Sequence, residues 1–278
     1  MARVHPDGVR VSTALISRSV RAERIRTGGR SRLWTVLIPA AATVPLAITV
    51  GIALVAESFA RIPGQISVLQ VSTSNAAYWV ITITITVTVT VTVTLVAVAA
   101  ADGQSSESRY RSAEYVRLAF PRQWPVLAGR WAFYGTLGVV TAAVTLVIVL
   151  VALPLVSPSV YGAVSVTDGT ALRLLWTVPV FAFFAAGAGV GVGAVVRSPL
   201  GAVGALLLWA FVIESAAGYL PSGASLQRFM PLLNGVYATG QDTVLVPPWD
   251  QNVALLYVCS LFTAIFLIAA VERTVLYG

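Results

Sequence analysis

Apolar residues gather into stretches that match the length of a membrane-crossing helix. A hydrocarbon core about 30 Å thick takes about 20 apolar residues in α-helix. The predicted spans are Leu33 to Ala56, Ala77 to Ala101, Trp131 to Leu153, Ala171 to Val196, Leu200 to Leu220, and Asn252 to Val271. Only Arg197, Ser198 and Pro199 separate the fourth from the fifth, which predicts a tight helical hairpin.

Within the second span, β-branched apolar residues alternate with threonine from Ile81 to Thr94. This period is typical of a β-strand, but the unpaired backbone of a single strand cannot cross lipid. We therefore predict a helix, in which threonine hydroxyls bond back to carbonyls of the preceding turn. One hypothesis is that a threonine stripe lines a translocation path, and the alternative is a low-complexity span with self-satisfied hydroxyls. The candidate stripe is Thr82, Thr86, Thr90 and Thr94, opposite Thr84, Thr88 and Thr92.

The segments between the spans predict three further features. Ser17 to Arg32 mixes apolar residues with arginines, which is typical of an amphipathic helix at the membrane surface. Residues 102–130 form a long charged loop, and residues 221–251 form an apolar segment outside the spans. In the latter, a short amphipathic helix would place Leu226, Phe229, Met230 and Leu233 on one face, as a re-entrant or interfacial element. The expected fold is all-α, one polytopic transmembrane domain over residues 1–278.

Composition and charge agree with a membrane protein and give it an orientation. Hydrophobic residues make up 57% of the chain and charged residues 10%, whereas soluble domains carry about 25% charged residues. All 18 basic residues are arginine, and fifteen of them flank the spans on one side. The positive-inside rule then predicts a plasma-membrane protein with both termini in the cytoplasm. Nucleic-acid binding is disfavoured, because the arginine-rich segments lack interleaved aromatic residues.

Several kinds of catalytic site are excluded by missing residue types. His5 is the only histidine and Cys259 the only cysteine, which excludes paired-histidine catalysis, a cysteine-rich metal site and an intrachain disulfide. The chain has no lysine, so it cannot contain a standard ATP-binding P-loop. We predict no catalytic residue, no metal site and no cofactor in this chain.

Two features inside the spans are candidates for function. Glu214 is the only ionisable residue expected deep in an apolar span, where a carboxylate normally faces a cavity or a partner. It is either an ion or proton site or a structural hydrogen-bonding anchor. Span four contains a glycine run that favours close helix packing over a flexible gate. The run is Gly187, Gly189, Gly191 and Gly193.

The arrangement resembles the membrane-spanning permease subunit of the ABC type 2 (exporter) transporter family, in its actinobacterial form. The resemblance rests on the basic leader VRAERIR and on the loop AEYVRLAFPRQWPVLAGRW between spans two and three. It rests also on GVGVGAVVRSPLGAVGALLLWAFVIESAAGYLP across spans four and five. Where family members often carry Gly-Thr after the Glu-Tyr pair, this chain has Val116 and Arg117.

The resemblance implies a function and a set of partners. The chain would form the translocation path of an ATP-driven exporter, with an N-terminal elbow helix in residues 1–32. Residues of the cytoplasmic loop would dock a separate ATPase subunit that binds the ATP and Mg²⁺, and a second permease chain would complete a homodimer or heterodimer. The implied coupling residues are Glu114, Arg117, Pro121 and Arg122. The alternative is a secondary transporter or channel that uses Glu214 as its ion or proton site.

Overall fold

The computed structural model describes residues 6–29, 31–60, 83–109, 123–241, 243 and 245–277. Throughout these residues the regular structure is helical, without a strand. Five of the helices described are long and apolar enough to cross a membrane. These are Leu33–Ser58, Trp124–Val156, Gly169–Val196, Pro199–Tyr219 and Gln251–Val275. The predicted all-α class is confirmed, and the helices fit a multi-pass membrane protein.

The second predicted span falls partly outside the described residues. From Ile83 the chain forms α3 (Ile83–Arg109), so the alternating segment is a helix and not a strand as far as it is described. The helix continues well past Ala101, the predicted end of the span. The helices that pack along it are α2 (Ile38–Ala60), α5 (Trp124–Val156), α7 (Gly169–Val196) and α8 (Pro199–Leu208).

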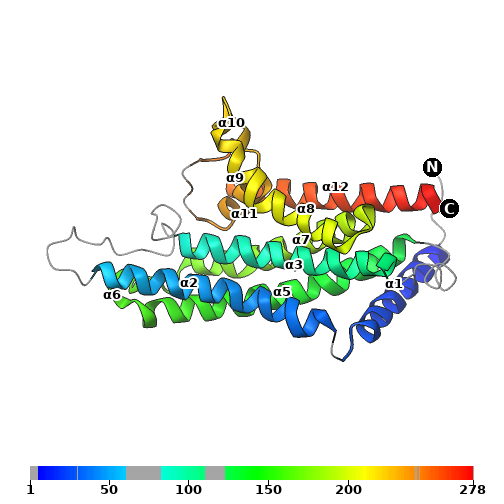
Figure 1. Ribbon diagram of the computed structural model, residues 1–278, viewed down its shortest axis with the longest axis horizontal. Helices are drawn as coiled ribbons and strands as arrows, with labels where there is room; N and C mark the ends of the chain where they lie inside the picture. Colours follow the sequence, from blue (N-terminus) through cyan, green and yellow to red (C-terminus); the bar gives the residue numbers. More distant parts are fainter. Residues whose placement is uncertain are drawn as a thin grey trace.

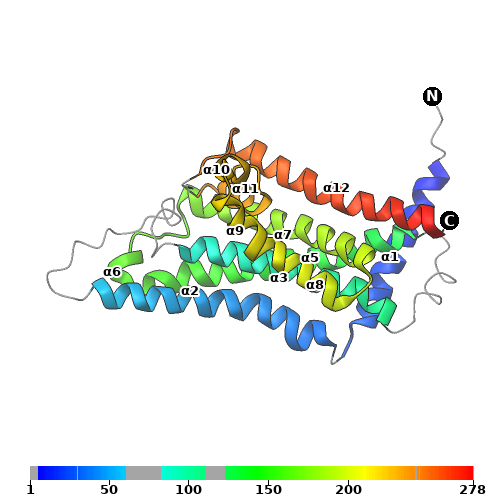
Figure 2. The same ribbon diagram turned by 45° about the horizontal axis from the view of Figure 1, so that its top comes forward.

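The long helices form an elongated bundle with distinct ends (Figure 1). Helices α2, α3, α5, α7 and α12 (Gln251–Tyr277) run roughly along its long axis. At one end, α1 (Pro6–Arg26) crosses obliquely beside the C-terminal end of α12. Toward the other end lie α6 (Pro158–Tyr161), α10 (Gly223–Gln227) and α11 (Pro231–Ala238), as Figure 2 shows from a second direction.

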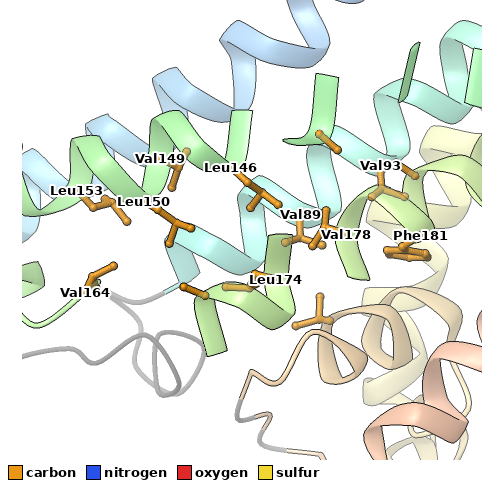
Figure 3. Close-up of a cluster of buried hydrophobic side chains, with 14 of the residues drawn as sticks. Val89, Val93, Leu146, Val149, Leu150, Leu153, Val164, Leu174, Val178 and Phe181 are labelled. Atoms are coloured by element: carbon orange, nitrogen blue, oxygen red, sulfur yellow. The ribbon is translucent and has the colours of Figure 1, made fainter. Parts of the chain in front are cut away.

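The centre of the bundle is an apolar core built by α3, α5 and α7. Their side chains point toward one another in Figure 3 and are almost completely shielded from the surface. Val89 and Val93 come from α3, Leu146 and Leu150 from α5, and Phe181 from α7. Because β-branched residues at alternate positions of α3 meet two neighbouring helices, the alternating pattern is compatible with a helix buried on several sides.

The hairpin between α7 and α8 forms at the three residues that the sequence indicated. Helix α7 ends at Val196, and Arg197 adopts a left-handed conformation with φ of 56°. The Ser198 hydroxyl oxygen then accepts a hydrogen bond from the Gly201 amide at 3.3 Å, which caps the start of α8 at Pro199. A chain reversal this short holds α8 beside the C-terminal half of α7.

Two predicted helices have different bounds. Helix α1 ends at Arg26, ahead of the Gly28-Gly29 pair, and it begins at Pro6. The expected amphipathic helix over Leu226 to Leu233 is wrong, because α10 ends at Gln227 and α11 begins at Pro231. Proline lacks the amide that would continue a preceding helix, but it suits the first position of a new one.

Candidate functional site

A buried ion pair joins the N-terminal helix to the transmembrane bundle. Glu23 of α1 and Arg130 of α5 are only 3% and 4% exposed. Arg130 Nε donates to Glu23 Oε2 at 3.2 Å, across 107 residues of sequence. Arg130 Nη1 donates to the Gln104 Oε1 atom of α3 at 2.7 Å. One guanidinium therefore ties three helices together.

Arg26 and Tyr134 enclose the same carboxylate from its other side. The Tyr134 hydroxyl donates to Glu23 Oε1 at 2.8 Å, and Arg26 forms a close ion pair with that oxygen. Arg26 Nη2 also donates to the Gly103 carbonyl oxygen of α3 at 2.7 Å. A side chain at Gly103 would overlap the Tyr134 ring, so glycine is needed for this approach. We call Glu23, Arg26, Gln104, Arg130 and Tyr134 the three-helix clamp.

The three-helix clamp joins the two helices that flank the predicted coupling residues in the sequence. Gln104 is near the C-terminal end of α3, and Arg130 is in the first turns of α5. The chain between these two helix ends contains Glu114, Arg117, Pro121 and Arg122, which lie outside the described residues. The clamp thus fixes α1 to the C-terminal part of α3 and to the first turns of α5.

Packing of backbones reinforces the junction of α1 with α5. The Ser19 hydroxyl donates to the Val126 carbonyl oxygen at 3.2 Å. A Cβ atom at Gly129 would lie 2.5 Å from the Ser19 side chain, so the two helices cross in close contact there. Removing one partner of a buried, hydrogen-bonded ion pair leaves a stranded charge, so loss of either Glu23 or Arg130 alone should destabilise this junction.

Sequence reasoning did not find the three-helix clamp. The predicted third span begins at Trp131 and leaves Arg130 outside it, but α5 begins at Trp124 and includes Arg130. One sequence feature did point to a buried ion pair. Glu23 is the only acid between Ser17 and Arg32. An isolated acid among arginines on an amphipathic helix has a choice of partners that sequence alone does not resolve.

The threonine stripe is only partly described. Thr82 lies outside the described residues, and for Thr86 only the helical backbone is described. Thr94 is 5% exposed, and Thr92, from the opposite stripe, is 1% exposed, so both faces of α3 are buried there. Within the described part of the chain their hydroxyls have no hydrogen-bond partner, contrary to the expected bonds back to the helix.

Glu214 lies at the end of a π-helical turn, η2 (Trp209–Ile213). A π-turn holds one extra residue, which rotates the following side chain relative to a regular α-helix. Phe211, Val212 and Ile213 are exposed, whereas Glu214 is 6% exposed. Its Oε1 atom accepts a hydrogen bond from the Leu233 amide at 2.8 Å, in the first turn of α11.

The Glu214 side chain caps the N-terminal end of α11. The first amides of a helix lack partners within it, and a carboxylate satisfies them and complements the helix dipole. This contact supports the anchor interpretation. The Oε2 atom is buried and has no partner among the described residues.

Glu57 is a third buried acid, which the sequence pattern did not single out. It was placed one residue beyond the first span, but α2 continues to Ala60 and Glu57 is 5% exposed. The hydroxyls of Ser157 and Ser159 donate to its two carboxylate oxygens, each at 2.8 Å. Glu57 lies next to the last residue of the candidate span Leu33–Ser58, so it is buried at the end of a span. Glu57 ties α2 to the junction of α5 and α6, at the end opposite the three-helix clamp.

The four glycines of α7 contact three different helices. A Cβ atom at Gly189 would overlap the Ala97 carbonyl oxygen of α3, and one at Gly193 would lie 2.5 Å from the Ala101 carbonyl oxygen. At Gly191 it would lie 3.0 Å from the Ile265 carbonyl oxygen of α12, and at Gly187 it would lie 2.6 Å from the Trp131 ring of α5. The absence of side chains lets α7 approach α3 and α12 closely.

Comparison of the chain with protein-family models, with curated proteins and with solved structures finds no match. Function is therefore inferred from the chain's own residues.

Proposed function

We propose that the chain is the transmembrane subunit of an ATP-driven exporter and works with a separate ATPase subunit. The observation that carries this proposal is the three-helix clamp, which joins α1 to the two helices α3 and α5. In the sequence, Glu114, Arg117, Pro121 and Arg122 fall between these two helices. The five apolar helices fit such a subunit, and the absence of lysine requires that a partner bind the ATP.

The three-helix clamp would transmit a movement of the residues between α3 and α5, caused by the ATPase subunit, to the bundle. The ends of α3 and α5 are joined through Arg130, and α1 is joined to both through Glu23 and Arg26. A displacement of the segment between them would therefore move three helix ends as one body. Rigid-body shifts of packed helices are a common route by which a binding event changes a membrane protein between two states.

The proposed orientation places the clamp end of the bundle in the cytoplasm. Arg26, Arg130 and Arg273 all lie at helix ends on this side, where α1 and the C-terminal end of α12 meet in Figure 1. Arg273 Nη2 donates to the Ala194 carbonyl oxygen at 2.6 Å, near the C-terminal end of α7. A cation is favourable at a helix C-terminus, and arginines gather on the cytoplasmic side of membrane proteins.

Site-specific cross-linking tests the ATPase partner. A photoactivatable residue placed at position 114 or 117, in the full chain in its own membranes, should cross-link to a protein with a P-loop. The matched control is position 219 near the opposite end, where Tyr219 is 92% exposed. Equal labelling of the ATPase from both ends, or labelling from neither loop position, would contradict the proposal.

A secondary transporter remains the second candidate, because the buried Oε2 atom of Glu214 has no partner among the described residues. Such a protein would move its substrate in proteoliposomes that contain this chain alone and a proton or cation gradient. The exporter proposal predicts no gradient-driven transport by the chain alone. Gradient-driven transport that Glu214→Gln abolishes would favour the second candidate.

A further inference from the structure

A partly open cavity lies between the membrane-spanning helices and the α10–α11 segment. This cavity has a volume of about 530 Å³ and is lined by α3, α7, α8, η2, α12 and the chain around Met230. Among its lining residues only Thr94, Trp209 and Tyr257 carry a side-chain nitrogen or oxygen. The rest of the wall is aliphatic or aromatic, as at Ala188, Leu206 and Phe262.

The volume of the cavity is in the range of ligand sites, and its lining has too few polar groups to hold ordered water. Ligand pockets in proteins span about 300–1,000 Å³. A buried water needs two or more polar partners, whereas apolar cavities stay dry and accept apolar guests. The Tyr257 hydroxyl already donates to the Phe229 carbonyl oxygen at 2.8 Å. A void of this size would forfeit van der Waals contacts all along its wall, so an apolar guest is favoured.

The cavity wall reaches the surface of the bundle between η2 and α10. Trp209, Leu226 and Phe229 line the cavity and are 44%, 47% and 46% exposed. The η2 turn belongs to the helix Pro199–Tyr219, which is long and apolar enough to cross a membrane. The surroundings of this opening are therefore lipid, and the apolar molecule in greatest supply is a lipid acyl chain.

We propose that this cavity binds one fatty acyl chain from the membrane, entered between η2 and α10, with the apolar end of the chain inside. The site is formed by a single copy of this protein and does not depend on an ATPase partner. Its occupancy and the proposed export function can therefore succeed or fail separately.

Photolabelling of the purified full chain tests the site. The probe is palmitic acid that carries a diazirine on its alkyl chain, added to the protein in detergent micelles. We expect saturable labelling in peptides that contain Leu206, Phe229 or Phe262, displaced by unlabelled palmitic acid. Labelling that does not saturate, spread over exposed residues such as Val147 and Leu267, would overturn the proposal.

Three variants sharpen the test, each checked for intact helix content and a monodisperse elution profile. Ala188→Leu and Ala205→Leu narrow the cavity and should each reduce the labelling at least fivefold, whereas Ala264→Leu on the exposed face of α12 should leave it unchanged. Unchanged labelling in both cavity variants would overturn the site.

Discussion

At the scale of single residues, the most informative groups are the charged side chains that the fold buries. Glu23, Glu57 and Glu214 are each 6% exposed or less, and each carboxylate accepts at least one hydrogen bond from a different helix or loop. Buried charges are costly unless they are paired and hydrogen-bonded. These three acids therefore act as fixed junctions between helices.

The first prediction concerns the ion pair of the three-helix clamp. Arg130→Met leaves the Glu23 carboxylate buried without its main partner and should lower the free energy of unfolding by about 3–5 kcal/mol. The double variant Glu23→Leu/Arg130→Met buries no charge and should recover most of that loss. Thermal unfolding in a single detergent measures both.

The control for this prediction is Arg24→Met, which changes an exposed arginine one residue from Glu23. Exposed substitutions change stability by about 0.5 kcal/mol or less. A loss in Arg24→Met as large as that in Arg130→Met would contradict the assignment of the effect to the buried pair.

Glu214 carries the second prediction at this scale. Glu214→Gln keeps an oxygen that can accept from the Leu233 amide, so stability and export should both stay close to those of the native protein. Glu214→Leu removes the cap and should cost about 1 kcal/mol, measured by unfolding in detergent. Loss of export in Glu214→Gln with unchanged stability would show that the charge itself matters.

At the scale of elements, α7 is the helix around which the others assemble. Its glycine run meets α3 and α12 backbone to backbone, and its other faces contribute Leu174, Val178 and Phe181 to the core. Small residues allow helices in lipid to gain van der Waals contact where no hydrophobic effect operates between them. The run is therefore a packing surface on two sides of one helix.

The third prediction tests this packing. Gly189→Ala would place a methyl group against the Ala97 carbonyl oxygen and should destabilise the protein by about 1–3 kcal/mol, as overpacking does. Gly204→Ala in α8 is the matched control, because a Cβ atom there meets nothing within 4 Å. It should be neutral or stabilising by about 0.5–1 kcal/mol, since alanine favours a helix over glycine. Equal unfolding temperatures for the two variants would contradict the packing role of Gly189.

At the scale of the whole molecule, the two ends of the bundle differ in kind. One end carries the three-helix clamp and the arginines of α1, α5 and α12. The other end carries the short helices α6, α10 and α11. Their contacts include Arg173 Nε to the Ala238 carbonyl oxygen at 2.9 Å and Trp249 Nε1 to Asn234 Oδ1 at 2.8 Å. This asymmetry suits a protein that is driven from one side.

The fourth prediction follows from that asymmetry. The double variant Glu114→Ala/Arg122→Ala removes two charges from the proposed coupling segment and should lower ATP-dependent export at least tenfold. Because neither residue belongs to an apolar span, insertion into the membrane should be unchanged. Export by proteoliposomes and membrane yield measure the two effects, and unchanged export would rule out the coupling role of these residues.

The fold could be predicted from the sequence where lipid permits only one solution. The alternating residues from Ile83 to Thr94 form a helix because a lone strand would leave its backbone unpaired, and this reasoning needs no tertiary information. The pairing of Glu23 with Arg130 could not be predicted, since it depends on how α1 crosses α5. The cavity beside Thr94 could not be predicted either. It is lined by the η2 turn and by the chain between α10 and α11, and a periodic sequence pattern indicates neither feature.

The most direct test of the proposed function is the ATPase content of the purified protein. The full chain, isolated in mild detergent from the membranes in which it is naturally made, should carry a stoichiometric P-loop subunit and hydrolyse ATP. Arg130→Met should retain the subunit but hydrolyse ATP at least tenfold more slowly, because the helix ends beside the coupling segment are no longer held together. Recovery of the intact chain without an ATPase, or full hydrolysis in Arg130→Met, would contradict this account.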